Sequence, residues 1–406
     1  MSSDHTLRLF TMRFPQGSGE AFLENELPVL AEGFRHVEIY PLFRAEGLRA
    51  LPPNVEVKHV LGDPYRPASV LEIAKHWRNW SMVMARLRAS APDGAHWRAA
   101  WRDTHSRMRQ ALSRAIRLRL ALASDPSALH YSYWSGDWAT VLGLLRVMDP
   151  GFRFVSRMHG FDLFAERQTQ GWPVFQRFHI EQAERVFVAS QAGLDDLQAR
   201  YPDHAGRFEL ARLGTRDHGH GPLPAEGPLH IVSCAHLVPL KRVALLAEAL
   251  HDVPVPWRWT HIGDGPERAE VEALAPRSEG TEVVLLGERP NAELLDWYRR
   301  TPIDVFVHTS ASEGGVPVAL QEAASFGIPL LALDAGGVRE IVNARTGVLL
   351  PHQATPAQLA AVLRDWRNSP GASSGFREGV RNYWSDHFRA EATFARFHER
   401  LLATLS

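Results

Sequence analysis

Strand-like and helix-like segments alternate along this chain in two series, which are separated by a short run rich in glycine and proline. Helical stretches lie between apolar strand-like segments, and this order predicts parallel sheets with right-handed crossovers. We therefore predict an α/β chain with two Rossmann-like domains, whose ligands bind beyond the carboxyl ends of the strands. The strand-like segments are 7–12, 36–41, 55–60, 128–134, 152–158 and 185–190, then 230–233, 257–262, 282–286, 303–308 and 329–333.

The run from His218 to Gly227 shows no apolar periodicity, so we interpret it as the interdomain linker. This interpretation gives an N-terminal domain over 1–217 and a C-terminal domain over 228–385. The last helical stretch, 386–406, is expected to pack back on the N-terminal domain. A cleft between two such domains is the natural place for a ligand.

Composition narrows the classes of function. The 406 residues are 45% apolar and carry a formal net charge of -1, so they can form two cores and give no sign of a nucleic-acid partner. The single cysteine, Cys234, makes neither a disulfide framework nor a zinc site. No apolar run approaches the roughly 18 residues of a spanning helix. We expect a cytoplasmic protein that at most rests on the inner face of a membrane.

The segment from His308 to Val342 constrains the function most. A buried strand ends in small polar residues and is followed by Glu313, two glycines, Val316 and Pro317. Proline is well placed as a first helical residue, and the glycines let the backbone approach a ligand closely. A helix N-terminus adds unpaired N–H groups and a partial positive charge. The segment therefore predicts a phosphate site that needs no lysine of its own.

The same segment, HTSASEGGVPVALQEAASFGIPLLALDAGGVREIV, resembles the donor signature of the family-four retaining glycosyltransferases, also called glycosyl transferases group 1. The resemblance implies the GT-B architecture, two Rossmann-like domains whose parallel sheets face across a cleft, with the donor in the C-terminal domain. It implies that Glu313 approaches the donor sugar and that Glu322 binds the ribose hydroxyls. The amides of Gly314, Gly315 and Val316 would then hold the diphosphate.

One spacing departs from the signature. The family has seven residues between its two glutamates, whereas Gly314 to Gln321 makes eight here. If Glu322 keeps its position on the helix, the extra residue must bulge in the loop before it.

A second segment, Ser233 to Val243, resembles the family stretch whose arginine and lysine clamp the donor diphosphate. His236 stands at the usual arginine position, so Lys241 and Arg242 are expected to carry the charge. Lysine acts as a point charge and arginine as a bidentate fork, and both suit phosphate. The alternative is that the two cations only begin a solvated helix.

Two N-terminal segments point to the acceptor. Ser156 to Asp162 (SRMHGFD) resembles the family's H-G-x-D segment, which implies that His159 lies between the acceptor and donor sugars. The opening stretch from Thr11 to Glu26 is similar to that of exopolysaccharide members, which implies acceptor contacts at Gly17, Gly19 and Glu20. The alternatives are that His159 has only a structural role and that the glycine loop is an ordinary tight turn.

Residues 72–120 form an arginine-rich, tryptophan-bearing helical stretch that is broken at Pro92–Gly94. From Lys75 to Arg119 there are eleven Lys or Arg and two Asp. A solvated helix face is the default interpretation. The alternative is that this surface rests on anionic lipid or holds a lipid diphosphate acceptor.

Together these segments predict a retaining hexosyltransferase that moves a sugar from a nucleotide-diphosphate donor to a saccharide or lipid-linked acceptor in surface polysaccharide synthesis. No cofactor is expected, and the absence of an Asp-x-Asp motif predicts no metal site. Two alternatives stay open: a nucleotide-sugar epimerase of the same fold, and a non-catalytic sugar-nucleotide-binding subunit.

Overall fold

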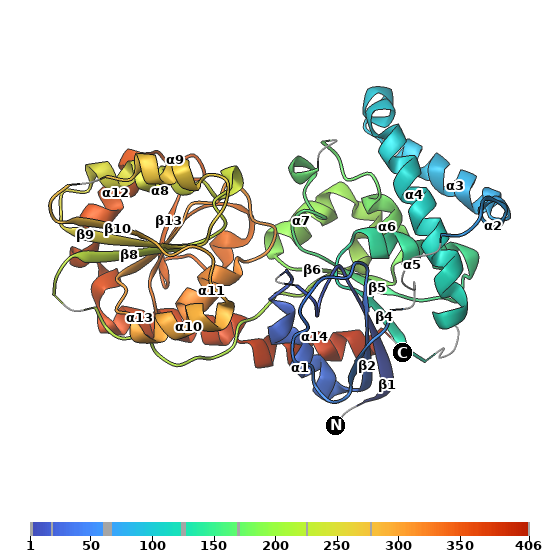
Figure 1. The fold of residues 1–406 in the computed structure, drawn as a ribbon, viewed down its shortest axis with the longest axis horizontal. Helices are drawn as coiled ribbons and strands as arrows, with labels where there is room; N and C mark the ends of the chain where they lie inside the picture. Colours follow the sequence, from blue (N-terminus) through green and yellow to red (C-terminus); the bar gives the residue numbers. More distant parts are fainter. Residues whose placement is uncertain are drawn as a thin grey trace. The chain divides into compact units, whose positions relative to one another are not determined.

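The computed structural model describes residues 3–17, 19–59, 67–122, 127–168, 171–224, 226–276 and 278–404. The chain forms two compact units. The first unit comprises Met1–Ala211 and Phe394–Ser406, and the second unit comprises Arg212–Thr393. Each unit is built around one parallel sheet with helices on both faces (Figure 1).

The first unit contains a seven-stranded sheet in the order β3-β2-β1-β4-β5-β6-β7, and all of its strand pairs are parallel. The order reverses between β1 and β4, which is the switch point where doubly wound folds bind ligands. The strands are β1 (Ser3–Thr11), β2 (Phe34–Pro41), β3 (Val55–Val57), β4 (Leu129–Ser132), β5 (Val155–Met158), β6 (Arg185–Val188) and β7 (Phe208–Leu210).

The second unit contains a six-stranded parallel sheet in the order β10-β9-β8-β11-β12-β13. Its switch point lies between β8 and β11, so the two sheets share one topology over six strands. The strands are β8 (Leu229–Cys234), β9 (Trp257–Ile262), β10 (Thr281–Leu285), β11 (Val305–His308), β12 (Leu330–Leu333) and β13 (Gly347–Leu350).

Successive side chains of the central strands point to opposite faces of the sheet, so the core of the second unit has two layers. Val305 and Val307 of β11 pack with α8 (Val243–Ala249), α9 (Arg268–Leu274) and α12 (Pro356–Arg364) on one face of the sheet. Phe306 packs on the other face with α10 (Asn291–Arg300), α11 (Val318–Ser325) and α13 (Ser374–Phe388) (Figure 1). Because both faces are covered, the strands are apolar almost throughout.

In the first unit, α4 (Gly94–Leu122), α5 (Asp137–Met148) and α6 (Gln176–Gln182) contribute to a core on one face of the sheet. The other face receives α14 (Ala390–Ala403), whose Phe397 contacts Tyr131 and Phe187. The remaining helices are α1 (Leu23–Gly33), α2 (Val70–Ala74), α3 (Trp77–Ala89) and α7 (Gln191–Arg200).

A buried ion pair fixes the places where the chain leaves and re-enters the first unit. Arg157 of β5 donates to Glu26 at 2.8 Å and to the carbonyl of Ala211 at 2.6 Å. Its guanidinium also lies over the ring of Phe397 at 4.5 Å. Neither charged side chain is exposed, so removing one partner would leave an uncompensated buried charge.

The expected alternation of strands and helices is confirmed, with differences at particular places. The edge strands β7 and β13 were not predicted, and the basic stretch contains three helices where two were expected. The expected strand 55–60 ends at Val57, and Val60 lies outside the described residues. The helix expected to begin at Pro317 begins one residue later, with Pro317 as its N-cap.

The expected linker, 218–227, falls inside the second unit, because the division of the chain lies between Ala211 and Arg212. Arg381 of α13 holds the start of this segment, because it pairs with Asp217, the residue before it, and donates to the carbonyl of Gly219 at 2.9 Å. No helix in the described part of the chain is long and apolar enough to cross a membrane.

Candidate active site

Two loops meet beyond the switch point of the second unit, one after β8 and one after β11. The Thr309 hydroxyl donates to the carbonyl of Lys241 at 2.9 Å, and the amide of Ala311 donates to the carbonyl of Leu240 at 2.8 Å. These bonds hold the two loops together and bring Lys241 next to Glu313, 72 residues further along the chain.

The carboxylate of Glu313 lies at the centre of this loop pair. Its Oε1 forms an ion pair with Lys241 and contacts Nε2 of His308 at 3.0 Å. Burial alone would raise the pKa of Glu313, but the hydrogen bond to His308 and the charge of Lys241 outweigh burial and hold that pKa well below its usual value. Glu313 is therefore a buried carboxylate that stays ionised.

Glycines let neighbouring backbone segments press against this loop pair. A Cβ at Gly336, where φ is 54°, would lie 1.8 Å from the carbonyl oxygen of Glu313, and one at Gly337 would lie 2.5 Å from that of Gly315. Gly263 repeats the arrangement at the loop after β8, where a Cβ would lie 1.9 Å from the carbonyl oxygen of Ala235. Gly336 and Gly337 of the donor signature, together with Gly263, therefore allow close packing of loops.

The eight residues between the two glutamates are accommodated before and within α11. Gly314 to Val316 form successive bends, and the Val316 side chain is buried in the core. Gln321 secures this turn by donating to the carbonyl of Val316 at 3.0 Å. The last of the eight residues thus anchors the bends before α11, and the bulge of an extra residue stays a prediction.

Glu322 lies buried on α11 and accepts a hydrogen bond from Nδ2 of Asn291 at 2.8 Å. Burial raises the pKa of Glu322 to about 7, and the bond from Asn291 opposes the rise only in part. Asn291 is the first residue of α10.

The other two residues predicted for the donor, His236 and Arg242, make no hydrogen bond or ion pair with Glu313. His236 is exposed. Arg242 has a left-handed backbone, with φ of 48°, and donates to the carbonyl of His352 at 3.1 Å. Of the predicted cations, the structure brings only Lys241 into contact with Glu313.

His159 follows β5 in the first unit and is buried among aromatic rings. Its ring centroid lies 4.7 Å from that of Tyr133 and 4.4 Å from that of Trp134. Neither ring nitrogen has a hydrogen-bond partner. Burial, aided by the charge of Arg157, holds the pKa of His159 well below its usual value, so the ring is neutral.

Asp162 shapes the turn that carries His159. One carboxylate oxygen accepts from the amides of His159, at 2.8 Å, and Gly160, at 3.1 Å, and the other accepts from the amide of Ser135 at 2.9 Å. The H-G-x-D pattern is thus a turn in which the aspartate fixes the backbone beneath the histidine. Burial raises the pKa of Asp162, against these bonds.

The predicted acceptor loop after β1 is organised by Glu20. Its carboxylate accepts from the amides of Met12, Arg13 and Phe14 at 3.1, 2.7 and 2.7 Å, and from the indole N–H of Trp134 at 2.7 Å. Four donors match the roughly four lone-pair sites of a carboxylate. Glu20 therefore shapes the loop and orients Trp134.

The two glycines of this loop differ in their surroundings. Gly17 has a positive φ of 68°, and its amide donates to the carbonyl of Glu46 at 3.0 Å. Gly19 has open space where a Cβ would stand, and its carbonyl accepts from Arg49 at 3.1 Å.

A profile of the family "Glycosyl transferases group 1" matches residues 228–368, which include every residue predicted for the donor. WcaL of Escherichia coli K12, described as a putative colanic acid biosynthesis glycosyltransferase, is 28% identical over 375 residues, 87% of this chain and 89% of that protein. The amylovoran biosynthesis glycosyltransferase AmsK of Erwinia amylovora is 28% identical over 388 residues, 88% of this chain and 89% of that protein. Residues 228–368 thus match a group 1 glycosyltransferase domain, and the chain is similar to two polysaccharide glycosyltransferases over most of its length.

Solved structures give the fold of this glycosyltransferase as GT-B. Anabaena HepE, crystallised with UDP, superposes with a TM-score of 0.67 at 15% identity over 98% of this chain and 100% of that one. Sucrose-phosphate synthase of Thermosynechococcus elongatus gives 0.70 at 17% identity over 99% and 100%. A Mycobacterium tuberculosis GDP-mannose-dependent alpha-mannosyltransferase is 40% identical, but only over 91 residues, 22% of each chain.

Two aromatic residues near His159 were not singled out from the sequence. Trp134 follows β4, and Phe161 packs against it with ring centroids 5.0 Å apart while remaining 46% exposed. The only sequence signal was their position directly after strands, because aromatic residues at such places more often belong to the core.

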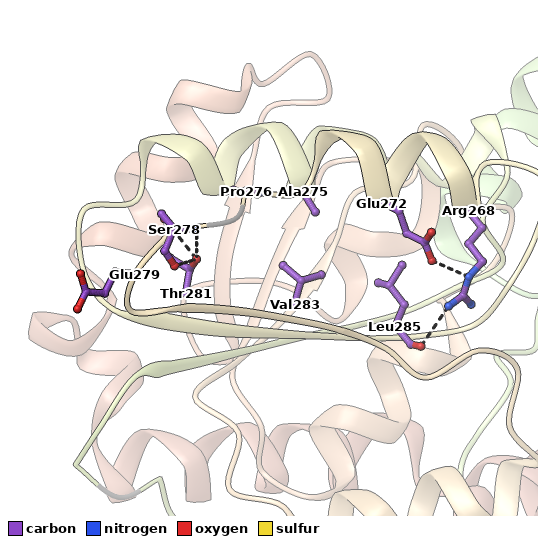
Figure 2. A pocket seen from close by; sticks show the side chains of 9 residues that line it. All are labelled: Arg268, Glu272, Ala275, Pro276, Ser278, Glu279, Thr281, Val283 and Leu285. Atoms are coloured by element: carbon purple, nitrogen blue, oxygen red, sulfur yellow. Dashed lines mark hydrogen bonds and ion pairs between the residues drawn. The ribbon is translucent and has the colours of Figure 1, made fainter.

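The glycosyltransferase also has a pocket of about 600 Å³ between α9 and β10 (Figure 2). None of the predicted donor residues lines it. Two pairs of polar residues in its lining bond to each other: Arg268 to Glu272 at 2.9 Å, and the amide of Ser278 to the hydroxyl of Thr281 at 3.1 Å. We assign no part of the donor to this pocket.

Proposed function

We propose that this glycosyltransferase moves a hexosyl residue from a nucleotide-diphosphate sugar to a saccharide or lipid-linked saccharide, with retention at the anomeric carbon and without a cofactor or resident metal. The observation that carries the proposal is the ion pair of Lys241 with the buried carboxylate of Glu313 beyond the switch point of the second unit. WcaL and AmsK support a polysaccharide acceptor, since their names place them in colanic acid and amylovoran biosynthesis.

The donor half of the proposal assigns the diphosphate to Lys241 and to the amides of Gly314, Gly315 and Val316. Lys241 is partly exposed beside Glu313, so a phosphate can share its charge without breaking the loop pair. Arg242 and His236 lie nearby in sequence and would contribute only after their side chains move. Glu322 would accept the ribose hydroxyls, as the family resemblance implies.

In the proposed reaction, the bond from the anomeric carbon to the diphosphate oxygen breaks and a bond to the acceptor oxygen forms on the same face. The acceptor proton passes to the departing phosphate. Positive charge develops on the sugar and negative charge on the diphosphate. Glu313, held ionised, would stabilise the first, and Lys241 would stabilise the second.

The acceptor half of the proposal lies in the first unit. His159 is neutral and has two unpartnered ring nitrogens, so it can donate one hydrogen bond to a sugar hydroxyl and accept another. Trp134 and Phe161 offer apolar surface beside it. Glu20, Gly17 and Gly19 would act by shaping the loop that holds Trp134. A lipid-linked acceptor would bring the enzyme to a membrane surface.

The deciding experiment is a donor screen. Wild type and Lys241→Ala are titrated with UDP-, GDP- and ADP-sugars, and thermal shift and slow donor hydrolysis are measured. We expect one nucleotide class to stabilise wild type and Lys241→Ala to lose roughly tenfold or more in affinity, as for loss of a charge-assisted hydrogen bond. Stabilisation by none of these donors would favour the non-catalytic alternative.

Product analysis then separates the remaining alternatives. Nuclear magnetic resonance of the first product should show the anomeric configuration of the donor, and inversion would refute the retaining mechanism. Conversion of the donor to a second nucleotide sugar in the absence of any acceptor would favour an epimerase.

A further inference from the structure

Helices α2 and α3 expose an unusual amount of apolar side chain. Of the ten large apolar side chains that are exposed among the described residues, five lie between residues 70 and 101. Val70, Leu71 and Trp77 are 82%, 77% and 61% exposed, and Met82 and Trp101 are 38% and 45% exposed. Single exposed apolar residues are normal, but a cluster indicates an interaction surface.

Only a narrow stripe of α3 is buried, where Val83, Met84 and Leu87 pack into the core of the first unit. Most other residues of α2 and α3 are exposed, among them Val70, Leu71, Ala74, Trp77, Ser81 and Met82. We call the exposed surface of these two helices the α2–α3 face.

An aromatic bridge connects the α2–α3 face to α4. His105 of α4 lies with its ring centroid 5.7 Å from that of Trp80 on α3 and 3.6 Å from that of the exposed Trp101. Trp101 therefore extends the apolar surface from one helix to the next.

Cations surround this apolar surface. Lys75, Arg78, Arg86 and Arg88 are exposed on α3 and the turn before it, and Arg98, Arg102 and Arg109 are exposed on α4. The acidic Glu72 forms an ion pair with Arg117 at 2.9 Å, and Asp103 forms one with Arg107 at 3.8 Å. The surface therefore combines exposed tryptophan and leucine with a strong excess of positive charge.

We propose that the α2–α3 face docks on an anionic lipid surface, with Val70, Leu71 and Trp77 inserted among the acyl chains and Lys75 and Arg78 at the headgroup phosphates. Interfacial helices carry this combination of apolar and basic residues. A second copy of this chain fits less well, because a two-fold contact would set the same cations against each other. This docking would bring the enzyme to a lipid-linked acceptor. The purpose of the docking rests on the proposed function, whereas the docking itself does not.

Vesicle sedimentation in the absence of donor and acceptor tests the docking. The full chain is mixed with phosphatidylcholine vesicles with or without phosphatidylglycerol, at low and at high salt. Wild type should sediment with the anionic vesicles, and high salt should weaken this binding. Three variants are compared: Leu71→Ser with Trp77→Ser, Lys75→Glu with Arg78→Glu, and Leu223→Ser as a control from the second unit that is 59% exposed.

The apolar double variant should lose roughly tenfold or more in vesicle affinity, since each buried apolar side chain contributes strongly. The charge variant should lose at least about fivefold for each cation, and the control should match wild type. Equal binding of wild type to neutral and anionic vesicles, or equal binding of all variants, would overturn the proposal. Light scattering that shows a dimer of wild type and a monomer of the apolar variant would assign the face to a second copy.

Transfer to a water-soluble acceptor separates this failure from failure of the proposed function. The apolar variant should keep wild-type activity on that acceptor, because its substitutions lie outside the donor and acceptor residues. Vesicle binding without transfer to that acceptor would support the docking and contradict the acceptor class given under the proposed function.

Discussion

The two units share one strand order over six strands, yet the residues beyond their switch points differ in chemistry. In the second unit, the loops after β8 and β11 bring a cation to a buried carboxylate. In the first unit, the loops after β1 and β4 bring the carboxylate of Glu20 to backbone amides and to the indole of Trp134. One topology therefore positions both loop pairs, and the loop residues decide whether a charge is available to a ligand.

The largest expected effect tests the charged pair of the second unit. Lys241→Ala and Glu313→Ala should each lower kcat/KM roughly 10²- to 10³-fold, as for loss of one preorganised electrostatic group. Nucleotide affinity should separate them: Lys241→Ala weakens binding, whereas Glu313→Ala leaves Lys241 without its carboxylate and so maintains binding. Steady-state kinetics and titration with the nucleoside diphosphate measure the two quantities.

Glu282→Ala is the matched control for this pair. Glu282 forms an exposed ion pair with Arg258 at 3.3 Å in the same unit, and such surface pairs contribute little. If Glu313→Ala retained wild-type turnover, the carboxylate would serve only to hold the loops.

The first unit provides the second test, because His159 and His179 are both buried yet differ in bonding. His159→Phe keeps the ring packing and removes two unpartnered nitrogens, so stability should hold or rise while kcat/KM falls roughly 10²-fold. His179→Phe should instead lower stability, since its nitrogens bond to Ser135 at 3.2 Å and Thr140 at 2.8 Å. Unfolding curves and kinetics on the two variants measure the contrast.

Full activity in His159→Phe would make the histidine a packing residue. The unsatisfied nitrogens would then be a cost without a function.

The difference between the units also explains what could be predicted from the sequence. The alternation of strands and helices and the glycine loop before α11 follow from local patterns, because a strand end, a glycine loop and a helix start are encoded by adjacent residues. Lys241, Glu313 and Glu322 were predicted from segments that resemble those of the glycosyltransferase family. Trp134 and Phe161 could not be found in this way, since their exposure depends on loops far apart in the chain. The edge strand β13 was missed because it is short and only half-buried, which weakens its apolar pattern.

The role of Glu20 shows a second limit of prediction from the sequence. The resemblance implied an acceptor contact, but the bonds of its carboxylate come from three amides of its own loop and one distant indole. Sequence patterns identify the residue type and leave open which donors reach it.

The pH dependence of Glu322 sharpens the contrast with Glu313. Its pKa of about 7 in the folded chain exceeds the ordinary value of 4.5, so the folded chain binds this proton more tightly than the unfolded chain. Its contribution to stability is therefore complete below pH 4.5 and is lost as the pH rises through about 7. Glu322→Gln removes this loss. Between pH 5 and pH 8, its free energy of unfolding should rise relative to that of wild type by roughly 3 kcal/mol at most.

Thermal and urea unfolding at both pH values measures this difference. Parallel pH profiles of wild type and Glu322→Gln would show that the carboxylate is hydrated or paired in solution. Glu313→Gln should show no such gain at high pH, because the pKa of Glu313 is lowered.

The smallest expected effect concerns Glu20. In Glu20→Gln, an amide N–H₂ replaces one oxygen that accepts from the backbone of Arg13 and Phe14, so donors face donors and roughly 1–2 kcal/mol of stability should be lost. Glu24→Gln, from the same region, weakens a partly exposed ion pair with Arg49 at 2.6 Å and should change stability by less than about 0.5 kcal/mol. If Glu20 acts by holding Trp134, stability and acceptor KM should change together. A changed acceptor KM with unchanged stability would mean that the carboxylate contacts the acceptor directly, and the two switch points would then be more alike than their bonding indicates.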